Sequence, residues 1–444
     1  MSDGRVHYAR NGDVRLAYRV FGDSGPLIVW VPGWVVSNVD TYDDADSPYA
    51  PLIERVTREA RIAVMDRRGA GLSDPITHPP SLDERMEDLR AVMDAVGEQP
   101  VLIGSGEGGA DCVLFAATYP DRVHSLMFWA TAARFSQELP DFPWGFTPDQ
   151  VAAQLDDIEN NWGAGALAEI YHGSNADLPG VREMFGKLQR SIASPALARY
   201  WWRALVQTDV RHVLGTIRTP TLVLARAGDG LVPIESARAL AAGIPGARFL
   251  EYPPGEHNGF DVLDMLATET LKFVCDEPGG LSDERILKTI LFTDIVSSTE
   301  QLSVAGDSHW RHQLDVHDKI IGAALNRYGG IRANHTGDGI FALFEGPTKA
   351  ARCALELIPA LATRGIRIRA GIHTGECERR GDQWSGLAVH TGARIGALAG
   401  AGEVLASRTV RDLSAGSGLT FESLGPQRLK GLPEDLEVFR VAVR

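Results

Sequence analysis

Short apolar segments that alternate with amphipathic ones constrain the first two-thirds of this chain most strongly. Between Val14 and Tyr252, turn residues closely follow each apolar segment. This alternation predicts an α/β domain in which helices cover both faces of a mostly parallel sheet. The segments expected to form its buried strands are Leu27–Val31, Ile62–Met65, Val101–Ile103, Ser125–Trp129 and Thr221–Ala225.

The alternation of apolar and amphipathic segments stops between about Phe135 and Val213. This stretch has a helical pattern and is rich in tryptophan and tyrosine. We expect a helical cap over 135–213, inserted at one end of the sheet. Its aromatic residues are Trp144, Trp162, Tyr171, Tyr200, Trp201 and Trp202.

A second domain is expected after a polar linker that contains glycine and proline. The domains predicted are 1–275, a linker at 276–285, and 286–444. Within the last of these the pattern predicts β-α-β-β-α-β, which is the ferredoxin-like α+β plan. The elements that carry this pattern are strands at Ile286–Thr293, Ile331–Asn334, Ile340–Phe344 and Arg367–His373, and helices at His309–Tyr328 and Pro347–Ala362.

Composition excludes several classes of function. The net charge of −14 over 444 residues argues against a protein that binds nucleic acid or an anionic membrane. The N-terminus lacks the apolar core of a signal peptide, and no apolar run approaches the ~20 residues of a membrane helix. The cysteines form no CxxC pair or zinc spacing, so we expect free thiols in a cytoplasmic protein. They are Cys112, Cys275, Cys353 and Cys377.

Two carboxylates stand at the ends of strands in the second domain. Asp294 closes the strand in FTDIV, and Asp338 lies in a Gly-Asp-Gly turn between two strands. A lone Gly-Asp-Gly segment is most often an ordinary β-turn. Paired with a second strand-end carboxylate, it can hold two divalent ions that bind phosphate oxygens.

Residues from Leu287 to Val443 resemble the class III adenylate/guanylate cyclase homology domain. The matching segments, in order, are FTDIVSST (292–299), HTGDGIFA (335–342), RAGIHTGE (369–376), GLAVHTGARIGALAG (386–400) and LKGLPE (429–434). The resemblance implies conversion of ATP to 3′,5′-cyclic AMP and pyrophosphate, with two Mg²⁺ or Mn²⁺ ions per site. It makes Asp294 and Asp338 the metal-binding pair, with the Ile295 carbonyl as a further ligand.

The resemblance also assigns the second half of the site. Arg394 would stabilise charge on the α-phosphoryl group, and His390, one helical turn earlier, would donate a hydrogen bond. Lys430 would contact the terminal phosphates. The alternative interpretation is that Lys430 is a solvated lysine near the C-terminus. In this family the two halves come from different subunits, so a homodimer would make two equivalent sites.

The base-recognition positions depart from the ATP-selective pattern. Asn334 stands where a lysine is usual, and Gln383 stands where an aspartate is usual. Each amide carries both a donor and an acceptor, so strict selectivity is not expected. ATP remains the expected substrate, with GTP as a second candidate.

Residues from about Tyr8 to Val274 resemble the α/β-hydrolase fold. The landmarks are VPGW (31–34), DRRGAGLSDP (66–75), IGSGEGG (103–109), ARAGDGLVP (225–233) and GEHNGF (255–260). The resemblance places the triad acid at Asp229 and the triad histidine at His257. The pocket residues it implies are Gly33, Trp34, Ser105, Gly106, Glu107, Asp229 and His257.

The nucleophile position departs from this family's pattern. When Gly104 and Gly108 frame the elbow, Gly106 occupies the nucleophile position and Ser105 comes one residue early. Three interpretations remain open: an inactive domain whose pocket binds a small regulatory ligand, a structural or dimerising module, and a hydrolase that uses Ser105. The sequence therefore predicts a cyclase with a degenerate hydrolase-like domain. The alternatives are a binding protein without turnover and a cyclase that is also an esterase.

Overall fold

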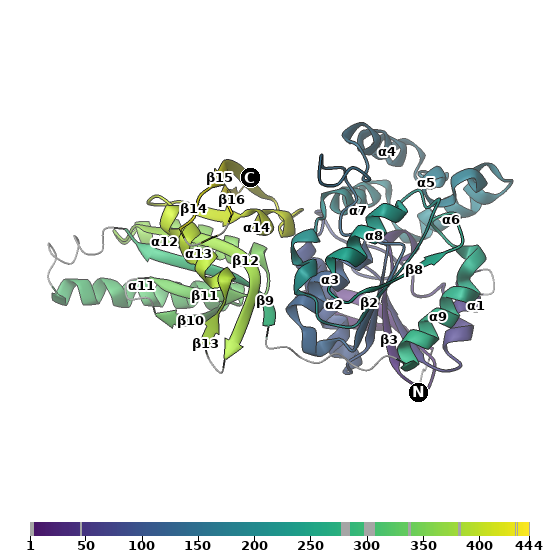
Figure 1. Cartoon of the computed structure of the whole chain (residues 1–444), viewed down its shortest axis with the longest axis horizontal. Coiled ribbons are helices and arrows are strands. Elements are labelled where there is room, and N and C mark those ends of the chain that lie inside the picture. The colour runs from purple at the N-terminus through teal and green to yellow at the C-terminus, as the bar shows by residue number, and fades with distance from the viewer. Residues whose placement is uncertain are drawn as a thin grey trace. The chain divides into compact units, whose positions relative to one another are not determined.

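A computed structural model of the chain describes residues 4–44, 47–276, 285–296, 307–335, 339–380, 383–430, 432 and 434–443. The chain divides into two compact units, Met1–Ser282 and Asp283–Arg444 (Figure 1).

The N-terminal unit is built on an eight-stranded sheet. Its first two strands form an antiparallel hairpin, and the strands from β4 to β8 run parallel. In sheet order the strands are β1 (His7–Asn11), β2 (Val14–Phe21), β4 (Arg61–Met65), β3 (Leu27–Val31), β5 (Val101–Ser105), β6 (Ser125–Trp129), β7 (Thr221–Arg226) and β8 (Arg248–Tyr252). The five strands expected from the sequence are all present.

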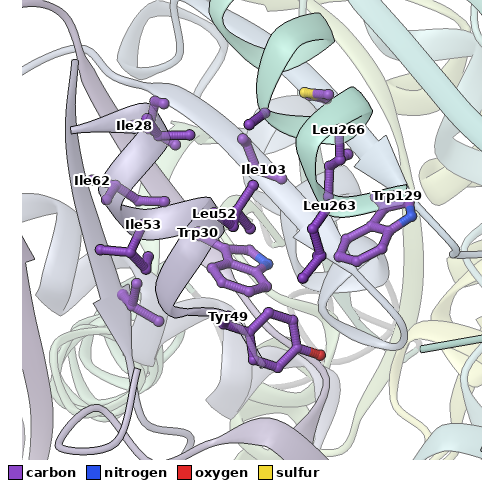
Figure 2. Packing of buried hydrophobic residues seen from close by; sticks show 14 of the residues in the cluster. Ile28, Trp30, Tyr49, Leu52, Ile53, Ile62, Ile103, Trp129, Leu263 and Leu266 are labelled. Atoms are coloured by element: carbon purple, nitrogen blue, oxygen red, sulfur yellow. The ribbon is translucent and has the colours of Figure 1, made fainter. Parts of the chain in front are cut away.

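Helices cover both faces of this sheet (Figure 1). One face packs against α1 (Ala50–Val56) and α9 (Leu263–Asp276), and the other carries α2 (Leu82–Val96), α3 (Gly108–Thr118) and α8 (Ile234–Gly243). In the first of these cores, Trp30 belongs to the same buried cluster as Leu52 of α1 and Leu263 of α9 (Figure 2). The buried strands are apolar throughout because both of their faces are covered.

The expected helical insertion lies between β6 and β7. Its helices are α4 (Pro148–Asn161), α5 (Ala168–His172), α6 (Val181–Ile192) and α7 (Pro195–Gln207). Helix α4 begins after Thr147, which forms a capping box with Gln150 in the first turn. The cap reaches the sheet domain through Trp162, whose ring stacks on that of Trp34 with centroids 5.2 Å apart.

The C-terminal unit has a second mixed sheet. Four of its strands follow the order β10-β11-β9-β12, which is the 2-3-1-4 order of the ferredoxin-like plan. In sheet order the strands are β10 (Ile331–His335), β11 (Ile340–Phe344), β9 (Arg285–Ile295), β12 (Ile368–Arg380), β14 (Val404–Ser407), β16 (Leu436–Val443) and β15 (Leu419–Gln427), with β13 (Gln383–Ser385) paired to β12.

Both faces of the C-terminal sheet are covered. Helices α11 (Asp307–Tyr328) and α12 (Pro347–Ala362) pack on one face, and α13 (Leu387–Leu398) packs on the other. Glycines allow α13 to approach β12 closely: a Cβ on Gly371 would lie 2.1 Å from the backbone nitrogen of Gly396. A short helix, α14 (Arg408–Leu413), follows β14. Within the described part of the chain, no helix combines the length and apolarity needed to span a membrane.

Candidate functional site

Asp294 lies near the end of β9, on the sheet face that α13 covers. Strand periodicity places it on the same face as Ile290 and Phe292, which pack in the cluster beneath α13. On the neighbouring strand, Ile340 is paired with Thr293. The first residue of β11 therefore lies beside the end of β9. Asp338, which falls between β10 and β11 in the sequence, lies outside the described residues.

Arg369 is paired with Asp294 across the strands. The register of β9 and β12 sets these residues directly opposite one another. Arg369 donates from Nε and Nη2 to Asp294 Oδ2, at 3.0 and 2.5 Å, and from Nη1 to the Ala397 carbonyl of α13, at 3.2 Å. Sequence reasoning did not single out Arg369, although it opens the matching segment RAGIHTGE.

The oxygen atoms at the end of β9 suit a hard divalent cation. The Asp294 side chain is 40% exposed, and both arginine contacts go to Oδ2. Oδ1 has no hydrogen-bond partner among the described residues. The next residue, Ile295, is buried and offers a backbone carbonyl at the same strand end. Carboxylate and carbonyl oxygens are the ligands that Mg²⁺ prefers.

His390 and Arg394 lie on the exposed face of α13. The opposite face of the helix, with Thr391 and Ile395, is buried against the sheet. Leu387 and Leu398 extend the exposed face at its two ends, and they are 59% and 44% exposed. His390 and Arg394 therefore point away from the sheet of their own chain. Together with Leu387 and Leu398 they form an exposed stripe along α13.

The remaining nucleotide-site candidates are less fully defined. Lys430 is exposed after β15. Asn334 pairs with Phe341 beside a β-bulge in β10, and Gln383 pairs with Arg380 at the start of β13. The side chains of Asn334 and Gln383 lie outside the described residues.

In the N-terminal unit, a sharp turn joins β5 to α3. Gly106 forms this turn with a φ of +53°, a conformation that L side chains rarely adopt. A Cβ at Gly106 would meet Gly33 Cα at 3.4 Å, which is ordinary contact. Ser105, one residue earlier, ends the strand. Its hydroxyl accepts a hydrogen bond of 2.9 Å from Trp30 Nε1 in the core of Figure 2.

Asp229 and His257 form a hydrogen-bonded dyad. His257 Nδ1 lies 2.9 Å from both carboxylate oxygens of Asp229. The carboxylate is held in turn by the backbone N–H groups of Leu231 and Val232, each at 2.8 Å. Tyr171 packs edge-on against the imidazole, with ring centroids 5.3 Å apart. The pair has the arrangement that the acid and base of a hydrolytic triad would need, while the elbow offers a glycine.

The sequence predicted Glu107 as a pocket residue but gave no role to its carboxylate. Its carboxylate Oε1 accepts a hydrogen bond of 2.5 Å from the backbone N–H of Trp34, whose indole is fully buried. In a hydrolase, the backbone N–H groups at the positions of Trp34 and Glu107 would polarise the carbonyl oxygen of the substrate. The only sequence signal was an acid among the glycines of IGSGEGG.

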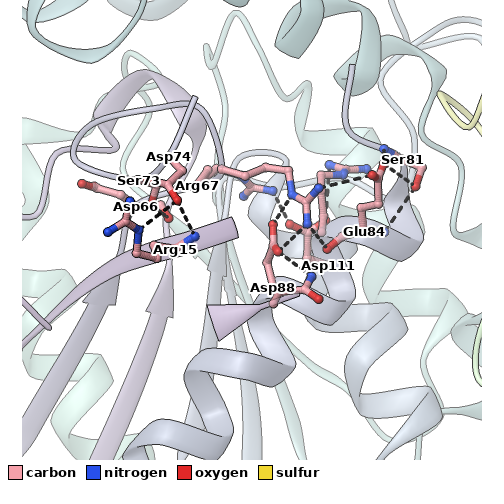
Figure 3. A network of polar contacts seen from close by, with 12 residues as sticks. Arg15, Asp66, Arg67, Ser73, Asp74, Ser81, Glu84, Asp88 and Asp111 are labelled. Carbon is pink, nitrogen blue, oxygen red and sulfur yellow. Dashed lines mark hydrogen bonds and ion pairs between the residues drawn. The ribbon is translucent and has the colours of Figure 1, made fainter. Parts of the chain in front are cut away.

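Buried charges surround Glu107. Burial raises the pKa of its carboxyl, against the nearby Arg67 charge and hydrogen bonds from the backbone N–H groups of Trp34 and Glu107 itself. Arg67 Nη1 lies 4.0 Å from Oε1, and the same guanidinium is bonded to Asp111 (Figure 3). Asp111 also pairs with Arg85 at 3.3 Å. The acid is therefore part of a buried ionic network.

Two adjoining cavities open at this site. The smaller, about 30 Å³, is lined by residues that include Gly33, Gly106, Glu107 and His257. A larger one, about 270 Å³, lies between residues 41–44 and 47–49 on one side and α6 on the other. They share three wall residues, which are Val36, Tyr49 and Asn258.

Residues 26–262 match the family model described as alpha/beta hydrolase fold, and the chain belongs to this family. It is 27% identical to the RutD protein of Azorhizobium caulinodans over 286 residues, 61% of this chain and 98% of that protein. It is 26% identical to a bifunctional esterase/perhydrolase of Acinetobacter calcoaceticus, over 55% of this chain and 90% of the relative.

Solved structures resemble each unit. An esterase from Exiguobacterium antarcticum matches with a TM-score of 0.54 and 21% identity, over 61% of this chain and 99% of the esterase. The C-terminal region matches adenylyl cyclases. One of them, CyaB from P. aeruginosa, has a TM-score of 0.34 and 21% identity, over 37% of this chain and 97% of that chain.

Proposed function

We propose that the C-terminal domain is a class III nucleotidyl cyclase that converts ATP to 3′,5′-cyclic AMP and pyrophosphate. The observation that carries the proposal is the placement of Asp294. It stands near the end of β9, beside the first residue of β11, in the first of the five matching sequence segments. Asp294, Asp338 and the Ile295 carbonyl would hold two Mg²⁺ or Mn²⁺ ions. These ions would activate the ribose 3′-hydroxyl and neutralise charge on the phosphates.

The exposed stripe of α13 supports a site shared between two chains. His390 and Arg394 point away from the sheet that carries Asp294 in the same chain. A second copy, related by a two-fold axis, would bring its Arg394 to the first chain's Asp294 and bury Leu387 and Leu398. Arg394 would then stabilise charge on the α-phosphoryl oxygens with its planar fork, and Lys430 would contact the terminal phosphates.

Turnover of ATP tests this proposal. Purified full-length protein is incubated with ATP and Mn²⁺, and 3′,5′-cyclic AMP and pyrophosphate are measured together. We expect equal amounts of the two products, with none formed after the metal is chelated. ATP consumption without cyclic AMP, or no consumption at protein concentrations that give a dimer, would contradict the proposal.

Base selectivity should be weak, because Asn334 and Gln383 can each present a donor or an acceptor. We expect measurable cyclic GMP formation from GTP. Asn334→Lys combined with Gln383→Asp should raise the preference for ATP by roughly 1–3 kcal/mol, the range for a polar group left unpaired by the wrong base. The measurement is kcat/KM for both nucleotides. Wild-type rejection of GTP by several orders of magnitude would show that other groups read the base.

We further propose that the N-terminal domain binds a small ligand and regulates the cyclase, without hydrolysis. Three features support this: glycine stands at the elbow, the Ser105 hydroxyl bonds to Trp30, and the Glu107 carboxylate faces the Trp34 N–H. A negative group at that position would repel the oxyanion that ester hydrolysis creates.

Esterase assays give the corresponding prediction. We expect no wild-type hydrolysis of p-nitrophenyl acetate above background, and no change in Ser105→Ala. Gly106→Ser should remain inactive while Glu107 is present, whereas Gly106→Ser with Glu107→Ala should gain weak activity. The strained φ at position 106 costs a serine about 1–2 kcal/mol, so thermal unfolding must accompany the assay. Robust wild-type hydrolysis that disappears in Ser105→Ala would make the protein bifunctional.

A further inference from the structure

The position of the Glu107 carboxylate changes what the hydrolase-like pocket can recognise. Oε1 accepts from the Trp34 N–H, and a Cβ at Gly33 would lie 3.4 Å from Oε2. The two oxygens thus lie between the elbow and the β3 loop, and Glu107 is among the residues that line the smaller cavity. A ligand that reaches this carboxylate meets hydrogen-bond acceptors.

The surrounding network holds this carboxylate in place. Glu107 is 1% exposed and Arg67 is 3% exposed. Arg67 is itself fixed, because it donates to the Pro32 carbonyl at 3.0 Å and bonds to Asp111. Figure 3 shows the pairing of Arg67 with Asp111. Moving Glu107 away would break its hydrogen bond with the backbone N–H of Trp34 and leave that buried donor unpaired, which is unfavourable.

The adjoining 270 Å³ cavity is mostly apolar. Its walls include Tyr49, Phe185, Leu188 and Phe260. His172 also lines it, but burial lowers the pKa of this histidine to about 4, and Asn258 Nδ2 lies 3.1 Å from its Nε2. At neutral pH the cavity therefore offers mainly apolar surface and a neutral, bonded imidazole, with Asp44 and Lys187 as its charged wall residues. An apolar ligand body fits such a wall.

We infer that this pocket binds a small apolar molecule through a hydrogen-bond-donating head group, a hydroxyl or an ammonium, which Glu107 accepts. The apolar body occupies the larger cavity, and His257 lines the junction beside the head group. Esters and carboxylates are disfavoured, because their oxygens would face the acceptor oxygens of Glu107. The inference rests on the proposed role of this domain as a ligand-binding regulator.

Four probes with one chain length test the head group: 1-octanol, octylamine, octanoate and methyl octanoate. Their binding to the full-length chain is measured by calorimetry without nucleotide. We expect the alcohol, the amine or both to bind at least tenfold more tightly than the ester and the carboxylate. An amine that surpasses the alcohol identifies a cationic head group, and equal binding of the two identifies a neutral donor.

The matched variants are Glu107→Gln and, as a control, Glu235→Gln at an exposed acid of α8. The first should reduce the preference for donor head groups by tenfold or more, and the second should leave it unchanged. If Glu107→Gln does not fold, the ranking of the four probes on the wild-type chain decides. Tightest binding of the ester or carboxylate, equal binding of all four, or no binding would overturn the inference.

Regulation is a separate measurement. Cyclic AMP production is followed with and without the tightest-binding probe. Binding without an effect on turnover would remove the regulatory role while leaving the pocket chemistry intact. An inactive cyclase would likewise leave the nucleotide-free binding result unaffected.

Discussion

Asp294→Ala should abolish cyclic nucleotide formation while the chain stays folded. The substitution removes a proposed metal ligand at the strand end. Loss of a residue that only supports a metal ligand lowers metal affinity or activity roughly 10–100-fold. We therefore expect the rate of cyclic AMP formation to fall by at least about 100-fold. Asp338→Ala should have the same effect. Initial rates with ATP and Mn²⁺ measure both.

The fold should tolerate the loss of Asp294. Its ion pair with Arg369 is partly exposed, with the two side chains 40% and 33% accessible, and such pairs contribute at most about 1 kcal/mol. Asp315→Ala, at an exposed carboxylate of α11, is the matched control and should keep wild-type activity. Near-normal turnover in Asp294→Ala would contradict the metal assignment.

Arg394→Ala should produce the second large loss. The guanidinium would contact charge that develops on the α-phosphoryl group, and removing one such donor costs roughly 10²–10³-fold in kcat. Arg394→Lys should recover part of the rate, because it keeps the charge but loses the bidentate fork. KM for ATP should change less than kcat, since the contact strengthens in the transition state.

The stability of the Arg394 variant should be close to wild type. Arg394 is exposed, and surface substitutions usually change the free energy of unfolding by no more than about 0.5 kcal/mol. Arg364→Ala, at an exposed arginine after α12, tests whether loss of positive charge alone lowers the rate. Equal losses in the two variants would show that Arg394 has no specific role.

Much of the fold could be predicted, because strands buried on both faces form continuous apolar runs. Leu27–Val31 and Ser125–Trp129 agree with β3 and β6 to the residue. The N-terminal hairpin of β1 and β2 was not predicted. Its residues are partly exposed and include charged side chains, so they give a weak apolar signal. Strand β12 runs to Arg380, seven residues beyond its predicted end at His373, because its polar second half still pairs with β9 and β13.

The sites were predictable where a local segment carries the chemistry. The Asp229–His257 dyad brings together residues from two recognised segments. The contacts of Glu107 and Arg369 depend on tertiary structure: one requires the β3 loop to lie against the elbow, and the other requires the β9–β12 register. No pattern within a few residues of sequence shows that these segments lie together, so neither contact could be inferred beforehand.

Mixing two inactive variants tests most directly whether the catalytic site is shared between chains. Asp294→Ala and Arg394→Ala are refolded or co-expressed with different tags, and heterodimers are isolated through both tags before cyclic AMP is measured. Each heterodimer should regain about one working site of its two, because one interface pairs an intact metal half with an intact Arg394 half. Isolated heterodimers that remain as inactive as either parent would contradict the account.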